Sequence, residues 1–275
     1  MASTEASPGE KKPPSYQIEA LARGLQVLAL FSERRPALRL TEIAAETGML
    51  MPRVYRIAMT LTAEGYLEQL PNGHYRPGVK VLALGFAALK SLELPEIARP
   101  AIERLAEETS ETANLGVLSG DQLVYLVRIR NRDLATSSTQ VGSLLPAVYT
   151  SGGKVLLAYL EESDLRSRIT SRSFDSGIGP RPRGDLERLL PELREIRRRG
   201  YALQNEEIVS GIRSVAAPVH GESGQVVAAV NVPVDAREWS AELLGEKLRP
   251  RVVEAAAEIS ALLGHRGGTS PNGIS

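Results

Sequence analysis

The chain has 275 residues, with 33 Lys and Arg against 33 Asp and Glu, three histidines and no cysteine. Without cysteine it has no disulfide scaffold, thiolate metal site or catalytic thiol, and His74, His220 and His265 lack the spacing of a metal site. The longest apolar stretch, residues 81–89, is too short to span a bilayer, and the first residues lack a signal-peptide pattern. We therefore expect a soluble, cytoplasmic protein with no cofactor, no metal and no membrane partner.

The charge is divided unevenly along the chain. The first 90 residues carry eleven Lys and Arg against eight Asp and Glu, whereas the remainder carries 22 against 25. The surplus is small, but it has the sign expected if the N-terminal third contacts phosphate.

The N-terminal third predicts a series of short helices. Residues 1–15 combine Pro, Gly, Ser and charge with little to bury, which predicts a disordered arm. In residues 16–32 the apolar positions recur every three or four residues, as in an amphipathic helix. A second helix is predicted over residues 40–48, with Thr41 as its N-cap and Gly48 as its left-handed end. Pro52 then opens a third helix.

A hairpin follows the third helix, which Gly65 ends. Residues 66–70 and 74–76 are strand-like and flank an Asn-Gly turn, a typical hairpin signal. Two helices joined by a tight glycine turn and followed by a hairpin indicate a winged helix-turn-helix domain over residues 16–77.

The predicted domain carries exposed cations that suit DNA. Those of the third helix can read bases and hold phosphates, although a solvated basic face is the alternative. Those around the hairpin suit backbone or minor-groove contact, but they are equally common as ordinary surface charges. The candidate DNA-contacting residues are Thr41, Arg53, Tyr55, Arg56, His74, Arg76 and Lys80.

A linker helix is predicted over residues 78–94. It is apolar nearly all round, so it needs partners on more than one side. Pro95 is expected to end it and to begin a second domain, residues 95–265, followed by a disordered tail over residues 266–275.

The second domain mixes strands and helices without regular βαβ alternation, which favours an antiparallel α+β fold over a Rossmann sheet. Ile102 and Leu105 are predicted to face inward from its first helix. A last helix is expected to be interrupted near Pro250. Strands are predicted within residues 114–129, 136–141, 213–218 and 226–234, and helices at 97–108, 150–160, 161–170 and up to Arg199.

Two groups of residues invite a chemical interpretation. Residues 151–154, Ser-Gly-Gly-Lys, are not a nucleotide phosphate loop, because Val148 and Val155 stand where a glycine and a hydroxyl are required. They remain either an anion-binding helix terminus or an ordinary capped helix. We do not expect Glu206 and Glu207, with His220, to share an acid/base site, because adjacent strand residues point to opposite faces. We do not expect an enzyme.

Three motifs occur in one order along the chain. The first is residues 40–48 through Arg56 and Gly65-Tyr66; the second is residues 141–146 followed by 150–158; the third is residues 200–207, 211–219 and 224–232. Together they resemble the IclR-type bacterial transcriptional regulators, from Ala20 to Leu263.

The resemblance implies a winged-helix DNA reader, a linker helix that helps dimerisation, and a GAF-like effector-binding domain. The partners would be a pseudo-palindromic double-stranded operator, a small organic acid, and further copies of the chain in a homodimer or tetramer. Repression and activation both stay open. By motif, the effector pocket would be lined by Leu134, Ser137, Ser151, Gly152, Gln204, Ser214, Asn231 and Pro233.

Residues 145–151 are similar to the branch of the family that regulates protocatechuate and 4-hydroxybenzoate breakdown, which implies an aromatic or dicarboxylic acid effector. The chain departs from the family in two places. Residues 49–51, Met-Leu-Met, stand where relatives have a polar cap and a cation or Ser, and Gln204 stands where some have Asp. A neutral amide tolerates a carboxylate that Asp would repel.

Two other classes stay open from the sequence. One is a metabolic enzyme or small-molecule sensor that carries a helix-turn-helix-like fragment without binding DNA. The other is an N-terminal domain with a purely structural role in assembly, which leaves the exposed arginines without a purpose.

Overall fold

The computed structural model describes residues 16–32, 35–90, 92–132, 139–175 and 184–266. The chain divides into two compact units, Met1–Ala88 and Leu89–Ser275. Each unit has a hydrophobic core of its own. The arm predicted at residues 1–15, and the predicted tail from residue 267 onward, lie outside the described residues.

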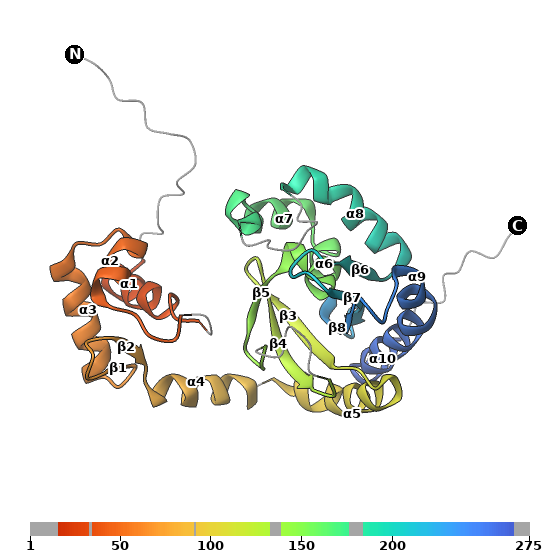
Figure 1. The fold of residues 1–275 in the computed structure, drawn as a ribbon, viewed down its shortest axis with the longest axis horizontal. Helices are drawn as coiled ribbons and strands as arrows, with labels where there is room; N and C mark the ends of the chain where they lie inside the picture. Colours follow the sequence, from red (N-terminus) through yellow and green to blue (C-terminus); the bar gives the residue numbers. More distant parts are fainter. Residues whose placement is uncertain (1–15, 33–34, 91, 133–138, 176–183, 267–275) are drawn as a thin grey trace, which may run out of the picture. The chain divides into compact units, whose positions relative to one another are not determined.

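The first unit has the predicted winged helix-turn-helix architecture. Its elements are α1 (Glu19–Leu28), α2 (Leu40–Thr47), α3 (Met51–Ala63), β1 (Leu67–Gln69) and β2 (Tyr75–Pro77) (Figure 1). Its small core includes Val27, Ile43, Val54 and Tyr75, so α1, α2 and α3 each contribute a buried side chain. The backbone of Tyr75 exchanges hydrogen bonds of 2.8 and 2.9 Å with Leu38, which ties the hairpin to the segment before α2.

The start of α2 differs from the prediction. Arg39 is the N-cap residue, and its N–H donates to the Glu42 carboxylate at 2.7 Å. Thr41 therefore lies exposed inside the first turn and is not the cap. The prediction was wrong because a glutamate at the third position of a helix can accept a hydrogen bond from the backbone N–H of the N-cap residue, whatever the type of that residue. Gly48 ends α2 with φ of 66°, as predicted.

The apolar positions of α1 are only partly buried. Val27 belongs to the core, whereas Ile18, Leu21 and Leu25 are 68%, 60% and 57% exposed. We call these three residues the α1 stripe. The periodicity identified the helix, but the unit itself does not bury this stripe.

Pro95 does not end a helix. The linker helix α4 (Val79–Lys90) ends earlier, and α5 (Glu93–Thr109) carries Pro95 in its first turn. A proline is tolerated there because the first N–H groups of a helix have no partner within it. Ile102 and Leu105 of α5 are buried, as predicted.

The second unit is built on a six-stranded sheet with the order β5-β4-β3-β8-β7-β6. Every pairing in it is antiparallel, which confirms the predicted α+β class. The strands are β3 (Ala113–Ser119), β4 (Gln122–Ile129), β5 (Leu144–Pro146), β6 (Ala202–Asn205), β7 (Ile212–His220) and β8 (Val226–Asp235).

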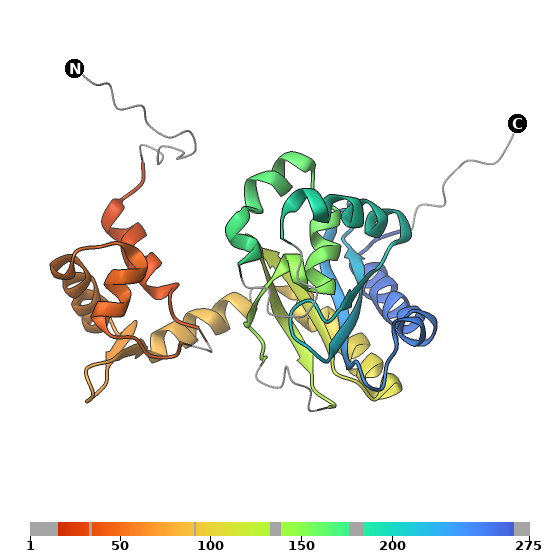
Figure 2. The ribbon, with the colours of Figure 1, turned by 45° about the horizontal axis from the view of Figure 1, so that its top comes forward.

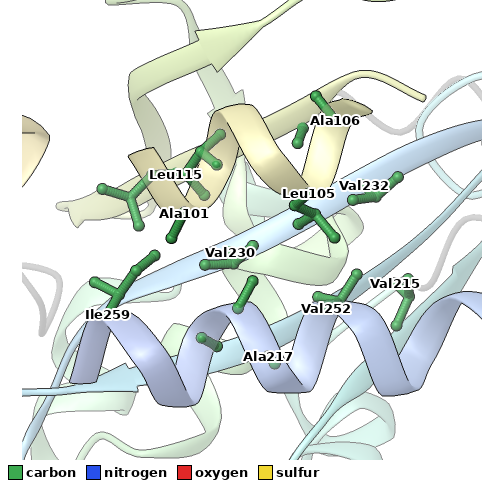
Figure 3. Close-up of a cluster of buried hydrophobic side chains, with 14 of the residues drawn as sticks. Ala101, Leu105, Ala106, Leu115, Val215, Ala217, Val230, Val232, Val252 and Ile259 are labelled. Atoms are coloured by element: carbon green, nitrogen blue, oxygen red, sulfur yellow. The ribbon is translucent and has the colours of Figure 1, made fainter. Parts of the chain in front are cut away.

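Helices cover both faces of this sheet (Figures 1 and 2). On one face, α5 and α10 (Arg249–Leu262) pack Leu105 and Val252 against Val215 and Val230 (Figure 3). On the other face, α6 (Ser151–Ala158) and α8 (Leu186–Arg199) pack against Tyr125 and other strand residues. The remaining helices are α7 (Glu162–Arg168) and α9 (Ala241–Leu243).

The strand predicted over residues 136–141 is not found where the structure describes that segment. Residues 139–141 are not in a strand, and residues 136–138 lie outside the described part. The strand is β5 instead, because Gly142 first turns the chain with φ of 88° and donates from its N–H to Tyr125 O at 2.8 Å. Leu144 then pairs with Val124.

The last helix is interrupted as predicted, by a turn of wider hydrogen bonding. A π-helical turn, Leu244–Leu248, connects α9 to α10, and Pro250 lies in the first turn of α10. Proline has no N–H to give, so the turn that precedes it can adopt other bonding.

Candidate functional site

The predicted DNA-contacting residues of the third helix lie on the exposed face of α3. Val54 and Ala58 point into the core, which leaves Arg53, Tyr55 and Arg56 on the exposed side of the helix. The three residues predicted from the helical spacing therefore share one surface. It offers two guanidinium groups and a phenol to a polyanion.

Arg53 is already paired. Its Nη2 lies 2.8 Å from Glu19 Oε1 of α1, and this bond lowers the pKa of the Glu19 carboxyl. Both side chains are exposed, and exposed ion pairs contribute little to stability. A phosphate group can therefore replace the carboxylate at small cost.

The hairpin cations are less available than the sequence suggests. Arg76 pairs across the hairpin with Glu68 at 2.9 Å, and Lys80 lies over the Tyr66 ring at 5.8 Å from its centroid. His74 is half-buried, and its backbone N–H donates to Asn72 Oδ1 of the turn at 3.2 Å. Thr41 is exposed at the start of α2.

The departure at residues 49–51 has a structural outcome. Met49 is buried in the core, whereas Leu50 and Met51 are 80% and 42% exposed at the start of α3. The turn that leads into the recognition helix is thus apolar on its surface. Apolar side chains in a major groove contact thymine methyl groups rather than phosphates.

The predicted effector residues of the second unit come together on the α6 side of the sheet. Strand register places Gln204, Ser214 and Pro233 side by side on β6, β7 and β8. Ser151 Oγ of α6 lies 2.7 Å from Ser214 Oγ, and all these side chains are buried. Asn231 lies two residues before Pro233 on the same face. Leu134 and Ser137 lie outside the described residues.

The start of α6 is capped by its own chain. Thr150 Oγ1 accepts a hydrogen bond from the Gly153 N–H at 3.0 Å. A Cβ on Gly153 would overlap Ala147, and one on Gly152 would press on Leu123 at 3.3 Å. Close packing therefore explains both glycines, Gly153 against the turn before α6 and Gly152 against β4, and this favours the capped helix over the anion-binding terminus.

Lys154 is fully buried, although the sequence predicted no buried charge here. Its Nζ lies 2.7 and 2.8 Å from the two Glu207 oxygens and 3.1 Å from Glu192 Oε1. The lysine thus ties α6 to α8 and to the β6–β7 connection, and it is engaged by protein carboxylates. A lysine within the apolar run of α6 was the available signal.

Glu206 and Glu207 do diverge, but for another reason than the one predicted. Both lie in the turn after β6, where Glu206 has φ of 57°. Glu206 accepts from Arg213 at 3.4 Å, whereas Glu207 holds Lys154. His220 is at the far end of β7, stacked on His265 with ring centroids 4.9 Å apart. The three residues therefore form no shared acid/base site.

The Gln204 amide has a structural role. Oriented with its oxygen toward the turn, it accepts from the Glu207 N–H at 2.7 Å, and its nitrogen donates to Ile212 O at 3.3 Å. This amide orders the turn that carries Glu207. A carboxylate could accept the same bonds but could not donate to Ile212.

Three buried or half-buried polar residues beside this cluster were missed from the sequence. Arg128 Nη1 donates to Asn114 Oδ1 at 2.9 Å, and the Tyr125 side chain lies beside Asn231. Burial raises the pKa of Tyr125 and lowers that of Arg128, whose guanidinium nevertheless stays charged. The available signal was the presence of polar residues within the apolar strands β3 and β4.

Among the described residues, no group of three His, Asp or Glu side chains could hold a metal ion. In the same part of the chain, no helix is long and apolar enough to cross a membrane.

The fold and these two sites define a class of protein: a DNA-binding regulator with a separate unit for a small ligand. A model of the IclR helix-turn-helix domain matches residues 20–71, and a model of the C-terminal domain of the bacterial transcriptional regulator IclR matches residues 86–261. The chain belongs to the IclR family of bacterial transcriptional regulators.

Individual relatives support this assignment. The chain is 32% identical over 250 residues to the transcriptional regulator XynR of Escherichia coli, covering 90% of this chain and 98% of XynR. It is 32% identical to the Pca regulon regulatory protein of Pseudomonas putida, covering 87% and 82% of the two chains. The crystal structure of an IclR homologue from Microbacterium hydrocarbonoxydans, complexed with 4-hydroxybenzoate, is 25% identical with a TM-score of 0.70, covering 89% and 99%.

These relatives are transcriptional regulators and not enzymes, which excludes the enzymatic alternative. The chain is a DNA-binding transcriptional regulator, and modulation by an effector is typical of its family.

Proposed function

We propose that this regulator binds a pseudo-palindromic operator as a homodimer or a dimer of dimers. Arg53, Tyr55 and Arg56 would enter the major groove, with further contacts from Thr41, His74, Arg76 and Lys80. The observation that carries the proposal is the exposed side of α3, where the three recognition residues stand together on a helix held by its apolar face.

The α1 stripe supports the homo-oligomer. Together with Val79, Leu82 and Leu84 of α4, which are 81%, 59% and 56% exposed, it leaves much apolar surface uncovered. A second copy of the chain is the fitting occupant, because a two-fold dimer presents two recognition helices to a two-fold operator. Sedimentation of the purified protein measures the assembly, and a monomer at micromolar concentration would contradict it.

We further propose that the effector is an aromatic or dicarboxylic acid of the protocatechuate and 4-hydroxybenzoate branch. Residues 145–151, the similarity to the Pca regulon protein and the 4-hydroxybenzoate complex of a homologue support this. The acid would bind on the polar side of the sheet beneath α6. Binding to one of two conformations would then change operator affinity.

Arg56→Ala tests the DNA interface. Binding to the DNA that flanks the gene should weaken by about 1–3 kcal/mol, because a base or phosphate contact is lost. Fluorescence anisotropy at several salt concentrations measures it. Arg198→Ala, an exposed arginine of the second unit, is the control and should bind as the wild type does. Unchanged affinity in Arg56→Ala and Arg53→Ala would contradict the assigned interface.

Thermal unfolding tests the effector class. The probes are protocatechuate, 4-hydroxybenzoate, β-ketoadipate and short keto acids. A ligand at 100 times its Kd adds about 2.7 kcal/mol of stability, which raises the unfolding midpoint. A selective rise with one acid supports the branch, whereas silence across the panel contradicts it and leaves DNA binding untouched.

A further inference from the structure

A row of polar side chains crosses three strands on the α6 side of the sheet. Strand register places Arg128 of β4 opposite Asn114 of β3, and Asn114 opposite Asn231 of β8. Adjacent strands are about 4.8 Å apart, so the three side chains are direct neighbours. Their sequence neighbours Leu115 and Val230 pack under α5 and α10 on the opposite face (Figure 3). We call Arg128, Asn114 and Asn231 the amide row.

The amide row contains two unmet hydrogen-bonding groups. Asn114 and Asn231 are 0% and 3% exposed. Asn114 Oδ1 accepts from Arg128, but Asn114 Nδ2 has no partner among the residues that the structure describes. Asn231 lies beside Tyr125, yet its Oδ1 has no partner within that same part of the chain. A buried donor and a buried acceptor left unpaired are costly, and each calls for a complementary atom.

The neighbouring polar cluster differs in this respect. Ser151 and Ser214 satisfy each other at 2.7 Å, and the Gln204 amide is used by the backbone of its turn. The groups that still require a partner are therefore concentrated at the amide row, one register step from the serines on the same face. There they lie beside a half-buried guanidinium that carries a permanent positive charge.

We infer that the amide row anchors the effector and that the effector is a hydroxy acid. Its carboxylate accepts from the Arg128 guanidinium and Asn114 Nδ2, and its hydroxyl donates to Asn231 Oδ1. A planar guanidinium beside an amide N–H matches a carboxylate, and only a ligand that also carries a donor satisfies Asn231. The inference rests on the proposed effector function, to which it adds the required hydroxyl group and the residues that select it.

The first experiment compares ligands that differ by one hydroxyl. The Kd values of benzoate and of 2-, 3- and 4-hydroxybenzoate for the full chain are measured by calorimetry, with malate and succinate as an aliphatic pair. At least one hydroxy acid should bind roughly tenfold more tightly than its counterpart without the hydroxyl, because the counterpart leaves Asn231 Oδ1 unpaired. The corresponding hydroxybenzamide, which lacks the charge, should bind more weakly than the acid.

Variants then separate the two contacts. Arg128→Gln should weaken the preferred hydroxy acid roughly tenfold or more, while Arg128→Lys, which keeps the charge, should lose less. Asn231→Ala should bring the hydroxy acid and its counterpart to similar Kd values. Arg130→Gln removes a nearby exposed charge and should change the Kd by no more than about threefold. Operator binding and the unfolding midpoint of each variant without ligand verify that it is folded.

The outcomes distinguish the two levels of the proposal. Equal binding of benzoate and all hydroxybenzoates, or full affinity in Arg128→Gln, would overturn the amide row while an acid effector stands. An absence of binding by every acid would overturn both the amide row and the proposed effector class. If water, and not an effector, pairs with Asn114 and Asn231, benzoate and the hydroxybenzoates should bind equally well.

Discussion

The two units place their polar groups in opposite environments. In the first unit, Arg53, Tyr55 and Arg56 stand on an exposed helix surface, and the one ion pair among them is solvated. In the second unit, Ser151, Lys154 and Asn231 are almost completely buried. Exposed charges suit a large polyanion that brings its own counterions. Buried polar groups are paired within the protein, as at Ser151 and Lys154, or suit a small ligand where an atom such as Asn231 Oδ1 has no partner among the described residues.

Lys154→Met should have the largest effect. It leaves the Glu207 carboxylate buried without its cation, and breaking a buried pair destabilises by about 3–5 kcal/mol. Urea unfolding measures the loss. Lys247→Met, at an exposed position, should change stability by less than about 0.5 kcal/mol. Equal stability of the two variants would mean that the buried ion pair of Lys154 does not stabilise the second unit.

Gly153→Ala should follow, at about 1–3 kcal/mol of destabilisation, because the new methyl group overlaps Ala147. Gly245→Ala is the matched change within a helical segment, since its methyl group meets nothing within 4 Å. A calorimetric midpoint lowered only in the first variant supports the tightly packed α6 start. Similar midpoints would favour a loosely held helix.

Leu50→Lys should leave stability unchanged and alter DNA binding. Leu50 is 80% exposed before α3, so a lysine there can reach a phosphate and release one more counterion. The slope of log affinity against log salt should steepen by about one. Leu50→Gln controls for the loss of the apolar side chain alone. An unchanged slope in Leu50→Lys would place this turn away from the DNA backbone.

The smallest expected effect concerns Glu111. Its carboxylate is 2% exposed and accepts from Trp239 Nε1 at 2.9 Å, and burial raises its pKa. A raised folded pKa means that the folded state binds the proton more tightly than the unfolded chain does. The ionised carboxyl is therefore unfavourable above that pKa, and this penalty disappears as the pH falls toward the unfolded value of about 4.5.

The stability of the wild type relative to Glu111→Gln should thus increase on acidification toward pH 4.5. Urea unfolding at several pH values measures the difference, with Glu246→Gln as an exposed control. A difference that stays constant or decreases with falling pH would show that burial does not dominate at Glu111.

The local signals in the sequence predicted most of the fold. Glycines with positive φ, the Asn-Gly turn and helical periodicity located the helices, the hairpin and the antiparallel strands. They failed where long-range contacts decide, as at Gly142, whose bond to Tyr125 displaces β5. Periodicity also could not tell a stripe that packs within the unit from the α1 stripe, which is exposed.

The candidate sites were predicted unevenly. Arg53, Tyr55 and Arg56 depend only on the period of one helix, so their common surface followed from the sequence. The amide row depends on the register of β3, β4 and β8, including an irregularity between Leu115 and Gly116. No spacing along the chain records such a register, and Arg128 and Asn114 therefore escaped notice.

The bond between Glu19 and Arg53 has a consequence for the search along DNA. If Arg53 contacts DNA as proposed, a phosphate must replace the Glu19 carboxylate on its guanidinium. An arginine that exchanges a carboxylate for a phosphate gains less free energy from counterion release than an unpaired arginine does, so it holds the protein less tightly on DNA during sliding. On the proposed interface the pair would therefore weaken binding to random sequence, while an operator that also engages Tyr55 and Arg56 would hold the protein.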